Sequence, residues 1–279
     1  MKKTISLLLI IVCLFSFASC GKNEITDTPP AGLQDGSLPL TVTVTFPEGF
    51  TLVQIAERLQ ENNVCTAAEF IELTNDRGYL KALTYSFLGG IDNPKKRPFI
   101  LEGYIFPDTY EFYTGEGAEA ALKRFLDNTE TKLTEAYKTR AAELGYSMDE
   151  ILTLASIIQE EAGEIQHMAD VSSVLHNRLN NEDYGILQCD VTINYINDAV
   201  KDSPYINKRV SSVSKNYNTY KCYGLPVGPI TNPGLHAIEA ALYPADTNYY
   251  FFVTDALRNY YYAETYEEHQ ANCEIAGIY

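Results

Sequence analysis

Hydrophobic and polar residues alternate strictly over residues 40–46, where Leu, Val, Val and Phe are separated by threonines. A period of two is typical of a half-buried β-strand. Thr51 and Thr66 are each followed three residues later by Gln or Glu and then by apolar residues at helical spacing. This is the pattern of a capping box, in which two side chains satisfy the first free amides of a helix. The pattern predicts a strand and two helices within residues 40–90.

Helical spacing returns in the polar, Ala-rich stretch 116–144, which ends at a glycine. Ser147, with a glutamate three residues later, forms a third capping box. It predicts a helix that runs to about Ala162 and is terminated by Gly163. A further helix is predicted over residues 169–180, because apolar residues recur on one side of it.

Beyond Gly185 the chain becomes rich in Tyr, Pro and Gly, and strands are predicted near 187–195 and 249–254. Helices mixed with separated strands indicate an α+β fold class. The predicted organisation is a small N-terminal module at 40–90 and a mixed α+β domain at 98–279. A Gly- and Pro-rich stretch separates the two.

The N-terminal residues predict export rather than fold. Residues 1–19 have two lysines followed by an apolar run that is short for a membrane span, as in a signal peptide. Cys20 directly after Ala-Ser resembles the bacterial lipobox and predicts lipidation, with the chain anchored on the extracytoplasmic face of the bacterial cell membrane. Phe17 is an unusual first residue of that box, so an ordinary secretory signal is the alternative. Residues 20–38, rich in Pro, Gly and polar residues, predict a flexible tether.

Charge and cysteine content exclude more than they select. The formal net charge of −16 argues against nucleic acid as a partner. None of the four histidines has metal-ligand spacing, and neither a CxxC pair nor a phosphate-binding loop is present, so no metal and no cofactor is predicted. For the four cysteines beyond Cys20, disulfides and free thiols are both open.

The helix that begins at Ser147 carries the candidate chemistry. At about 100° per residue, Glu161 falls beside Leu154 and Ile158 at the edge of an apolar face, and Glu160 falls on the opposite, solvent-facing side. Loss of hydration raises the pKa of a carboxyl group, and the negative end of the helix dipole acts in the same direction. A glutamic acid that is protonated near neutral pH can protonate a glycosidic oxygen. Taken alone, the pattern also fits a surface glutamate whose stem packs on the helix.

Six segments in order, covering most of the chain beyond the tether, carry a family resemblance: LEGYIFPDTYEF, LASIIQEEAG, VSSVLHNRL, LQCDVTINY, YNTYKCYGLPVGPITNPG and AALYPADTNYYFFV. Together they resemble the YceG-like, MltG-type endolytic murein transglycosylases. In that family the catalytic glutamate is the last of an E-x-E arrangement, which matches Glu161. Two departures are visible: Gln159 replaces the first glutamate, and Arg258-Asn259-Tyr260 stands where the family has Gly-Gly-His.

The resemblance implies an endolytic lytic transglycosylase that cleaves MurNAc–GlcNAc bonds of peptidoglycan and leaves 1,6-anhydroMurNAc ends. Glu161 would be the general acid and then the general base, and the muramic acid's own 6-hydroxyl would be the nucleophile, so one carboxylate suffices. A hydrolase of the usual kind needs two. Family-matched positions expected to line the substrate cleft are Asn177, Arg178, Gln188, Asp190, Tyr217, Asn218, Thr219 and Tyr220.

Structural readings of these positions stay open. Asn177 and Arg178 equally fit a loop clamp or an ion pair. Gln188 and Asp190 would share one face of the predicted strand and so line one wall of the cleft; the alternative is a structural turn contact. The strand with FPEGFTLVQIAERL after it resembles the family's LysM-like module, a type that binds N-acetylglucosamine-containing glycans; the alternative is a packing domain without a ligand.

Expected partners are peptidoglycan glycan strands, the membrane through the lipid anchor and, by the resemblance, penicillin-binding synthases with elongation and division proteins. Two alternatives stay open. One is a non-catalytic peptidoglycan-binding or scaffold lipoprotein, which Gln159 and Tyr260 favour. The other is a muramidase-type hydrolase.

Overall fold

The computed structural model of the chain describes residues 40–206 and 210–278. The predicted signal peptide, Cys20 and the whole of the predicted tether therefore lie outside the described residues. Within the described part of the chain, no helix is long and apolar enough to cross a membrane.

The predicted N-terminal strand is confirmed as β1 (Thr41–Thr45), in which only the alternate residues Val42 and Val44 lose exposure. It pairs antiparallel with β2 (Thr109–Tyr113). The elements between them are α1 (Leu52–Glu61), α2 (Ala67–Asn75), α3 (Arg77–Ala82) and the 3-10 turn η1 (Leu88–Gly90). Both predicted capping boxes are present at the starts of α1 and α2. Because β2 belongs to the range 98–279, the two predicted domain ranges share one sheet, and one buried apolar cluster continues through both.

The stretch 116–144 forms two helices, α4 (Ala118–Lys132) and α5 (Glu135–Leu144). The break occurs where the Thr134 hydroxyl accepts a hydrogen bond from Tyr137 N and caps α5. The second helix ends at Gly145, whose φ of 83° is left-handed, a conformation that glycine adopts without steric cost.

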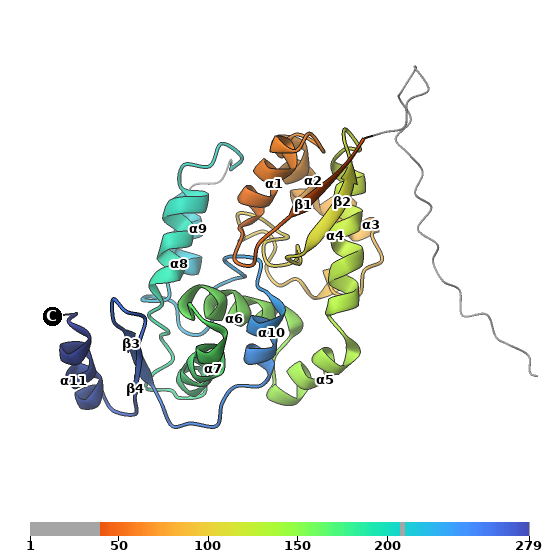
Figure 1. Ribbon diagram of the computed structural model, residues 1–279. Helices are drawn as coiled ribbons and strands as arrows, with labels where there is room; N and C mark the ends of the chain where they lie inside the picture. Colours follow the sequence, from red (N-terminus) through yellow and green to blue (C-terminus); the bar gives the residue numbers. More distant parts are fainter. Residues whose placement is uncertain (1–39, 207–209, 279) are drawn as a thin grey trace, which may run out of the picture.

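At the centre of the molecule lies α6 (Met148–Glu161), which begins with the predicted capping box at Ser147 (Figure 1). Every residue from Ile151 to Ile158 is buried, so the helix is covered all round rather than on one apolar face. It packs against α7 (Ile165–Leu179) and α10 (Leu235–Leu242). A helix buried on all sides needs small or hydrogen-bonded residues where its polar side chains lie. Thr153 and Ser156 meet this need by donating to backbone carbonyls one turn back.

The strand predicted near 187–195 is wrong. Residues Asp190–Tyr195 form the short helix α8, followed by the π-helical turn η2 (Ile196–Val200) and α9 (Val210–Tyr217). The buried residues of α8 are Thr192 and Tyr195, three apart, which is helical spacing. The strand prediction failed because the run is short, and short apolar runs fit both periods.

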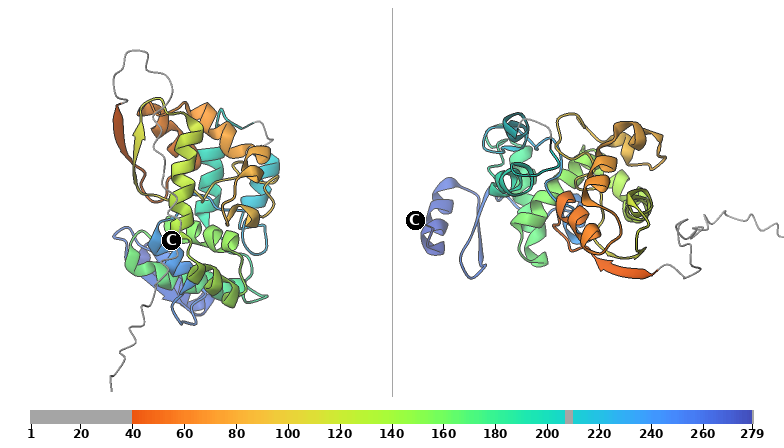
Figure 2. Two further views of the ribbon diagram at one scale, coloured as in Figure 1. Left: turned by 90° about the vertical axis from the view of Figure 1, so that its right-hand side faces the viewer. Right: turned by 90° about the horizontal axis from the view of Figure 1, so that it is seen from above.

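The C-terminal elements are the antiparallel pair β3 (Phe251–Thr254) and β4 (Tyr260–Ala263) and the helix α11 (Tyr266–Ala276). They stand at one end of the molecule, next to the α6–α7 region (Figure 1; Figure 2, right). The strand predicted near 249–254 is confirmed as β3. Helices combined with two small separate sheets confirm the α+β class.

Candidate active site

Glu161 is the last residue of α6, and its side chain is partly buried, neither sealed in the interior nor fully in water. Its neighbour Glu160 is exposed, as predicted. Burial raises the pKa of the Glu161 carboxyl to about 7, and the nearby charge of Asp190 acts in the same direction. A hydrogen bond with the Cys189 side chain opposes the shift. At neutral pH this carboxyl therefore exists in both forms, which a group that first donates and then accepts a proton requires.

Asp190, the first residue of α8, is exposed and lies close enough to Glu161 for their charges to interact. The Tyr220 hydroxyl donates a 2.7 Å hydrogen bond to Asp190 Oδ1, and the ring of Tyr220 is 45% exposed. The structure thus brings together two acids and an accessible aromatic ring. Aromatic rings stack on sugars and carboxyl groups transfer protons. This combination therefore suits the binding and cleavage of a sugar.

A second group of predicted residues holds the segment that leads into Asp190. Arg178 Nη2 donates to Gln188 Oε1 at 2.6 Å. Gln188 has a left-handed φ of 58°, and its N–H donates to Thr219 O at 3.0 Å. The buried Thr219 hydroxyl accepts from Cys189 N at 2.9 Å. These contacts fix the backbone that carries Asp190, and Gln188 is itself exposed, as Asp190 is.

Three predicted residues have other surroundings. Tyr217 is fully buried, with its ring 5.3 Å from that of Tyr195, so the expected contact between its ring and a sugar is corrected to a packing role. Asn177 donates to Thr247 O at 2.8 Å and to Tyr249 O at 2.9 Å, which is a loop clamp. Asn218 is partly buried, and its side-chain oxygen accepts from Tyr220 N at 3.0 Å.

Cys189 is a site neighbour that sequence reasoning missed. Read as a strand residue between Gln188 and Asp190, it would point away from both. In the structure it is buried beside Glu161, and burial raises the pKa of its thiol well above the usual range. All four cysteines of the described chain are free thiols.

A second missed neighbour is Tyr260, which was noted in the sequence only as a departure from the family pattern. Its hydroxyl donates to the Glu161 carbonyl at 2.9 Å and accepts from Gly163 N at 2.8 Å. It comes from β4, 99 positions away from Glu161. No local sequence signal predicts such a contact.

Comparisons with known proteins match nearly the whole chain. The model of the YceG-like family matches residues 27–275. The chain belongs to the YceG-like family. It is 31% identical to the endolytic murein transglycosylase of Bacillus subtilis over 85% of its length, and covers 66% of that protein. It is 27% identical to the endolytic murein transglycosylase of Streptococcus pneumoniae over 86% of its length, and covers 46% of that protein.

A solved structure of a YceG-like protein from Listeria monocytogenes is similar, with a TM-score of 0.67 and 29% identity. The match covers 82% of this chain and 75% of that one. The chain thus spans just under two thirds of one curated relative and less than half of another.

In this YceG-like chain, Gln159 has a structural function. Its Oε1 accepts a 2.9 Å hydrogen bond from Gly234 N, the N-cap residue of α10. The Glu48 carboxyl packs so closely on Gly234 that a Cβ there would lie 2.0 Å from it. A neutral acceptor at position 159 therefore caps the helix without adding a further negative charge beside Glu48.

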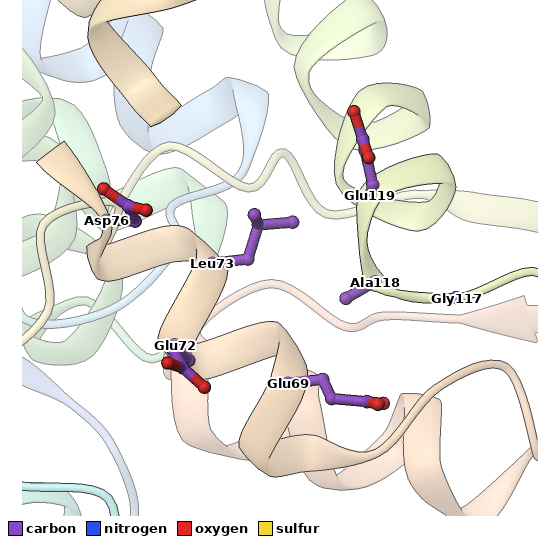
Figure 3. A pocket seen from close by; sticks show the side chains of 7 residues that line it. All are labelled: Glu69, Glu72, Leu73, Asp76, Gly117, Ala118 and Glu119. Atoms are coloured by element: carbon purple, nitrogen blue, oxygen red, sulfur yellow. The ribbon is translucent and has the colours of Figure 1, made fainter. Parts of the chain in front are cut away.

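An open cavity of about 410 Å³ lies between α2 and the start of α4, away from these residues (Figure 3). Its lining residues are Glu69, Glu72, Leu73, Asp76, Gly117, Ala118 and Glu119. It contains none of the predicted site residues. In the described part of the chain, no group of three or more His, Cys, Asp or Glu residues is arranged to hold a metal ion.

Proposed function

We propose that this chain is an endolytic peptidoglycan lytic transglycosylase that cleaves MurNAc–GlcNAc bonds, with Glu161 as general acid and then general base. The observation that carries the proposal is a partly buried glutamate, at the family's catalytic position, whose carboxyl pKa is raised by burial to about 7. The names of the relatives support the same reaction.

The proposed reaction balances without water. Protonated Glu161 donates to the oxygen that links the two sugars, and the bond from this oxygen to the anomeric carbon breaks through an oxocarbenium-like state. The Glu161 carboxylate then takes the proton of the muramic acid's 6-hydroxyl while that oxygen bonds to the anomeric carbon. The acid is regenerated and a 1,6-anhydro ring is left. Because the nucleophile is part of the substrate, its effective concentration is high.

Asp190 and Tyr220 are the residues proposed to meet the sugar. The negative charge of Asp190 beside Glu161 would stabilise the positive charge that develops at the anomeric carbon. The exposed ring of Tyr220 would stack on a sugar face. Arg178, Gln188 and Thr219 are proposed to hold the loop beneath them.

A muramidase-type hydrolase is the second candidate, and one observation favours it: Asp190 provides a second carboxylate near Glu161. The test is mass spectrometry of the fragments that purified protein releases from uncrosslinked glycan strands. The proposal expects anhydro ends. Fragments heavier by one water would identify the hydrolase, and binding without cleavage would support the scaffold alternative.

Anchoring and glycan binding are further proposals. Cys20 after Ala-Ser supports lipidation and a place on the extracytoplasmic face of the bacterial cell membrane. A Cys20→Ser variant is then expected to lose metabolic labelling with palmitate and to leave the membrane fraction.

For the LysM-like module, pull-down of the Glu161→Gln variant on peptidoglycan, with and without substitutions in α1, tests glycan binding. Co-purification with penicillin-binding synthases tests the proposed partners.

A further inference from the structure

The C-terminal end of α6, where Glu161 lies, lacks the glycine cap that is common at helix ends. Many helices end with a glycine in the left-handed conformation, whose N–H then bonds a carbonyl of the last turn. Here the C-cap residue Ala162 is extended, with φ −93° and ψ 97°. Gly163, which the sequence predicts as the terminator, is not among the residues with positive φ. The last carbonyls of a helix have no partner within it, so another group must satisfy them.

The Tyr260 hydroxyl is such a group. It donates to the carbonyl of Glu161 at 2.9 Å and accepts from the N–H of Gly163 at 2.8 Å. One oxygen atom therefore connects the backbone on both sides of Ala162. This takes the place of the bonds that a glycine closure makes within the chain.

The ring that carries this hydroxyl is itself held in place. It stacks on the His167 imidazole of α7, with ring centroids 4.1 Å apart and planes 18° apart. On the sheet side it packs near Phe252 of β3, at 6.4 Å between centroids. The bridging oxygen is thus fixed relative to both α7 and the hairpin, and not only to α6.

We propose that Tyr260 is a positioning residue for Glu161, which fixes the end of α6 so that the carboxyl is presented to the glycan in one orientation. The inference rests on the proposed function. Tyr260 does not touch the reacting atoms; it acts through the backbone of Glu161. The hairpin of β3 and β4 thereby stabilises the C-terminal end of α6.

The test is Tyr260→Phe, which removes the hydroxyl and keeps the ring. Kinetics are measured on soluble uncrosslinked glycan strands. Because small misplacements of a catalytic group cost rate, we expect kcat to fall about tenfold, while KM changes by less than about twofold. Tyr260→His, which restores a donor at the family's histidine position, is expected to recover part of kcat.

The matched control is Tyr261→Phe, which removes the neighbouring hydroxyl in the same strand. Among the residues that the structure describes, that hydroxyl bonds only Asp255, in the hairpin turn, at 3.2 Å. We expect wild-type kcat and KM from it. Amide hydrogen exchange gives a readout independent of activity: exchange at Gly163 should accelerate in Tyr260→Phe and not in Tyr261→Phe.

Unchanged kcat in Tyr260→Phe, or equal losses in Tyr260→Phe and Tyr261→Phe, would overturn the positioning role, as would unchanged exchange at Gly163. If the wild-type protein releases no fragments at all, the proposed function fails and the positioning role fails with it. An active wild type beside an equally active Tyr260→Phe would overturn the positioning role alone.

Discussion

Burial raises the pKa of three glutamates in the described part of the chain, and the two with the largest shifts, Glu102 and Glu161, differ in their surroundings. Burial raises the pKa of Glu102 to about 8 and that of Glu161 to about 7. Glu102 is fully buried, whereas Glu161, at the end of α6, is only partly buried. A raised pKa therefore does not by itself identify a catalytic acid.

The hydrogen bonds separate the two carboxyl groups further. Glu102 Oε1 accepts from Leu52 N at 2.8 Å, at the start of α1, and from Asn232 Nδ2 at 3.1 Å. Tyr195 donates to its other oxygen at 3.2 Å. Glu102 therefore joins three parts of the core, whereas Glu161 has a hydrogen bond with the Cys189 side chain. What distinguishes Glu161 is that it is only partly buried.

Exchanging each carboxyl for an amide should give the largest contrast. Glu161→Gln removes the group that donates one proton and then takes up another in the proposed mechanism, so kcat on glycan strands should fall by about 10²–10⁴-fold. Glu102→Gln should keep activity within about threefold, because an amide resembles the protonated acid that it replaces. Circular dichroism checks that both variants fold. Comparable losses of kcat in the two variants would contradict a catalytic role that is specific to Glu161.

When the free energy of unfolding is measured instead of activity, truncation of Glu102 rather than of Glu161 should be the damaging change. Glu102→Ala leaves buried donors unpaired, so the free energy of unfolding should fall by about 2–4 kcal/mol. Glu161→Ala should instead raise it near neutral pH, because a carboxyl whose pKa burial raises to about 7 destabilises the fold when it ionises. Urea unfolding measures both.

Glu102 also makes stability depend on pH: its folded-state pKa lies above the unfolded value of about 4.3.

The direction follows from proton binding. Between about pH 4.3 and pH 8 the folded protein keeps a proton on Glu102 that the unfolded chain releases, so the free energy of unfolding falls as pH rises through this window. Glu102→Gln should flatten that fall. A slope unchanged from wild type would show that Glu102 is ionised in the folded state.

Asp190→Asn should move the pH profile of activity. The reaction needs protonated Glu161, so kcat/KM should fall as pH rises through about 7. The Asp190 charge is one cause of the raised pKa of Glu161, and its removal should shift this alkaline limb to lower pH. If Asp190 is instead a required second carboxylate, activity should disappear at every pH.

The smallest effect is expected from Gln159→Glu, which restores the family's first acidic residue. The new carboxylate can still accept from Gly234 N, so α10 should stay capped. Its charge two positions from Glu161 should move the alkaline limb slightly to higher pH, with kcat within about threefold. A loss of stability would indicate repulsion from Glu48, which packs on Gly234.

The sequence predicted what local chemistry determines. Capping boxes at Thr51, Thr66 and Ser147 are present because each involves residues only three apart. The alternation that predicted β1 is likewise a property of consecutive residues. The order of Glu160 and Glu161 around α6 followed from helix geometry alone.

The missed features depend on residues far apart in the chain. The segment near Gln188 is turned by bonds to Thr219, which no periodicity encodes. Tyr217 was expected at a sugar because it belongs to the family-matched segment 217–220, yet tertiary packing buries it fully. The contact of Tyr260 with Glu161 joins β4 to α6. Sequence could place the acid on its helix but not the groups that surround it.

Carbon-13 NMR titration of the Glu161 carboxyl, assigned with Glu161→Gln, tests the central claim most directly. We predict a midpoint near pH 7, as burial and the Asp190 charge require. A midpoint near the ordinary glutamate value of about 4.3 would mean that the group is ionised at neutral pH and cannot serve as the acid.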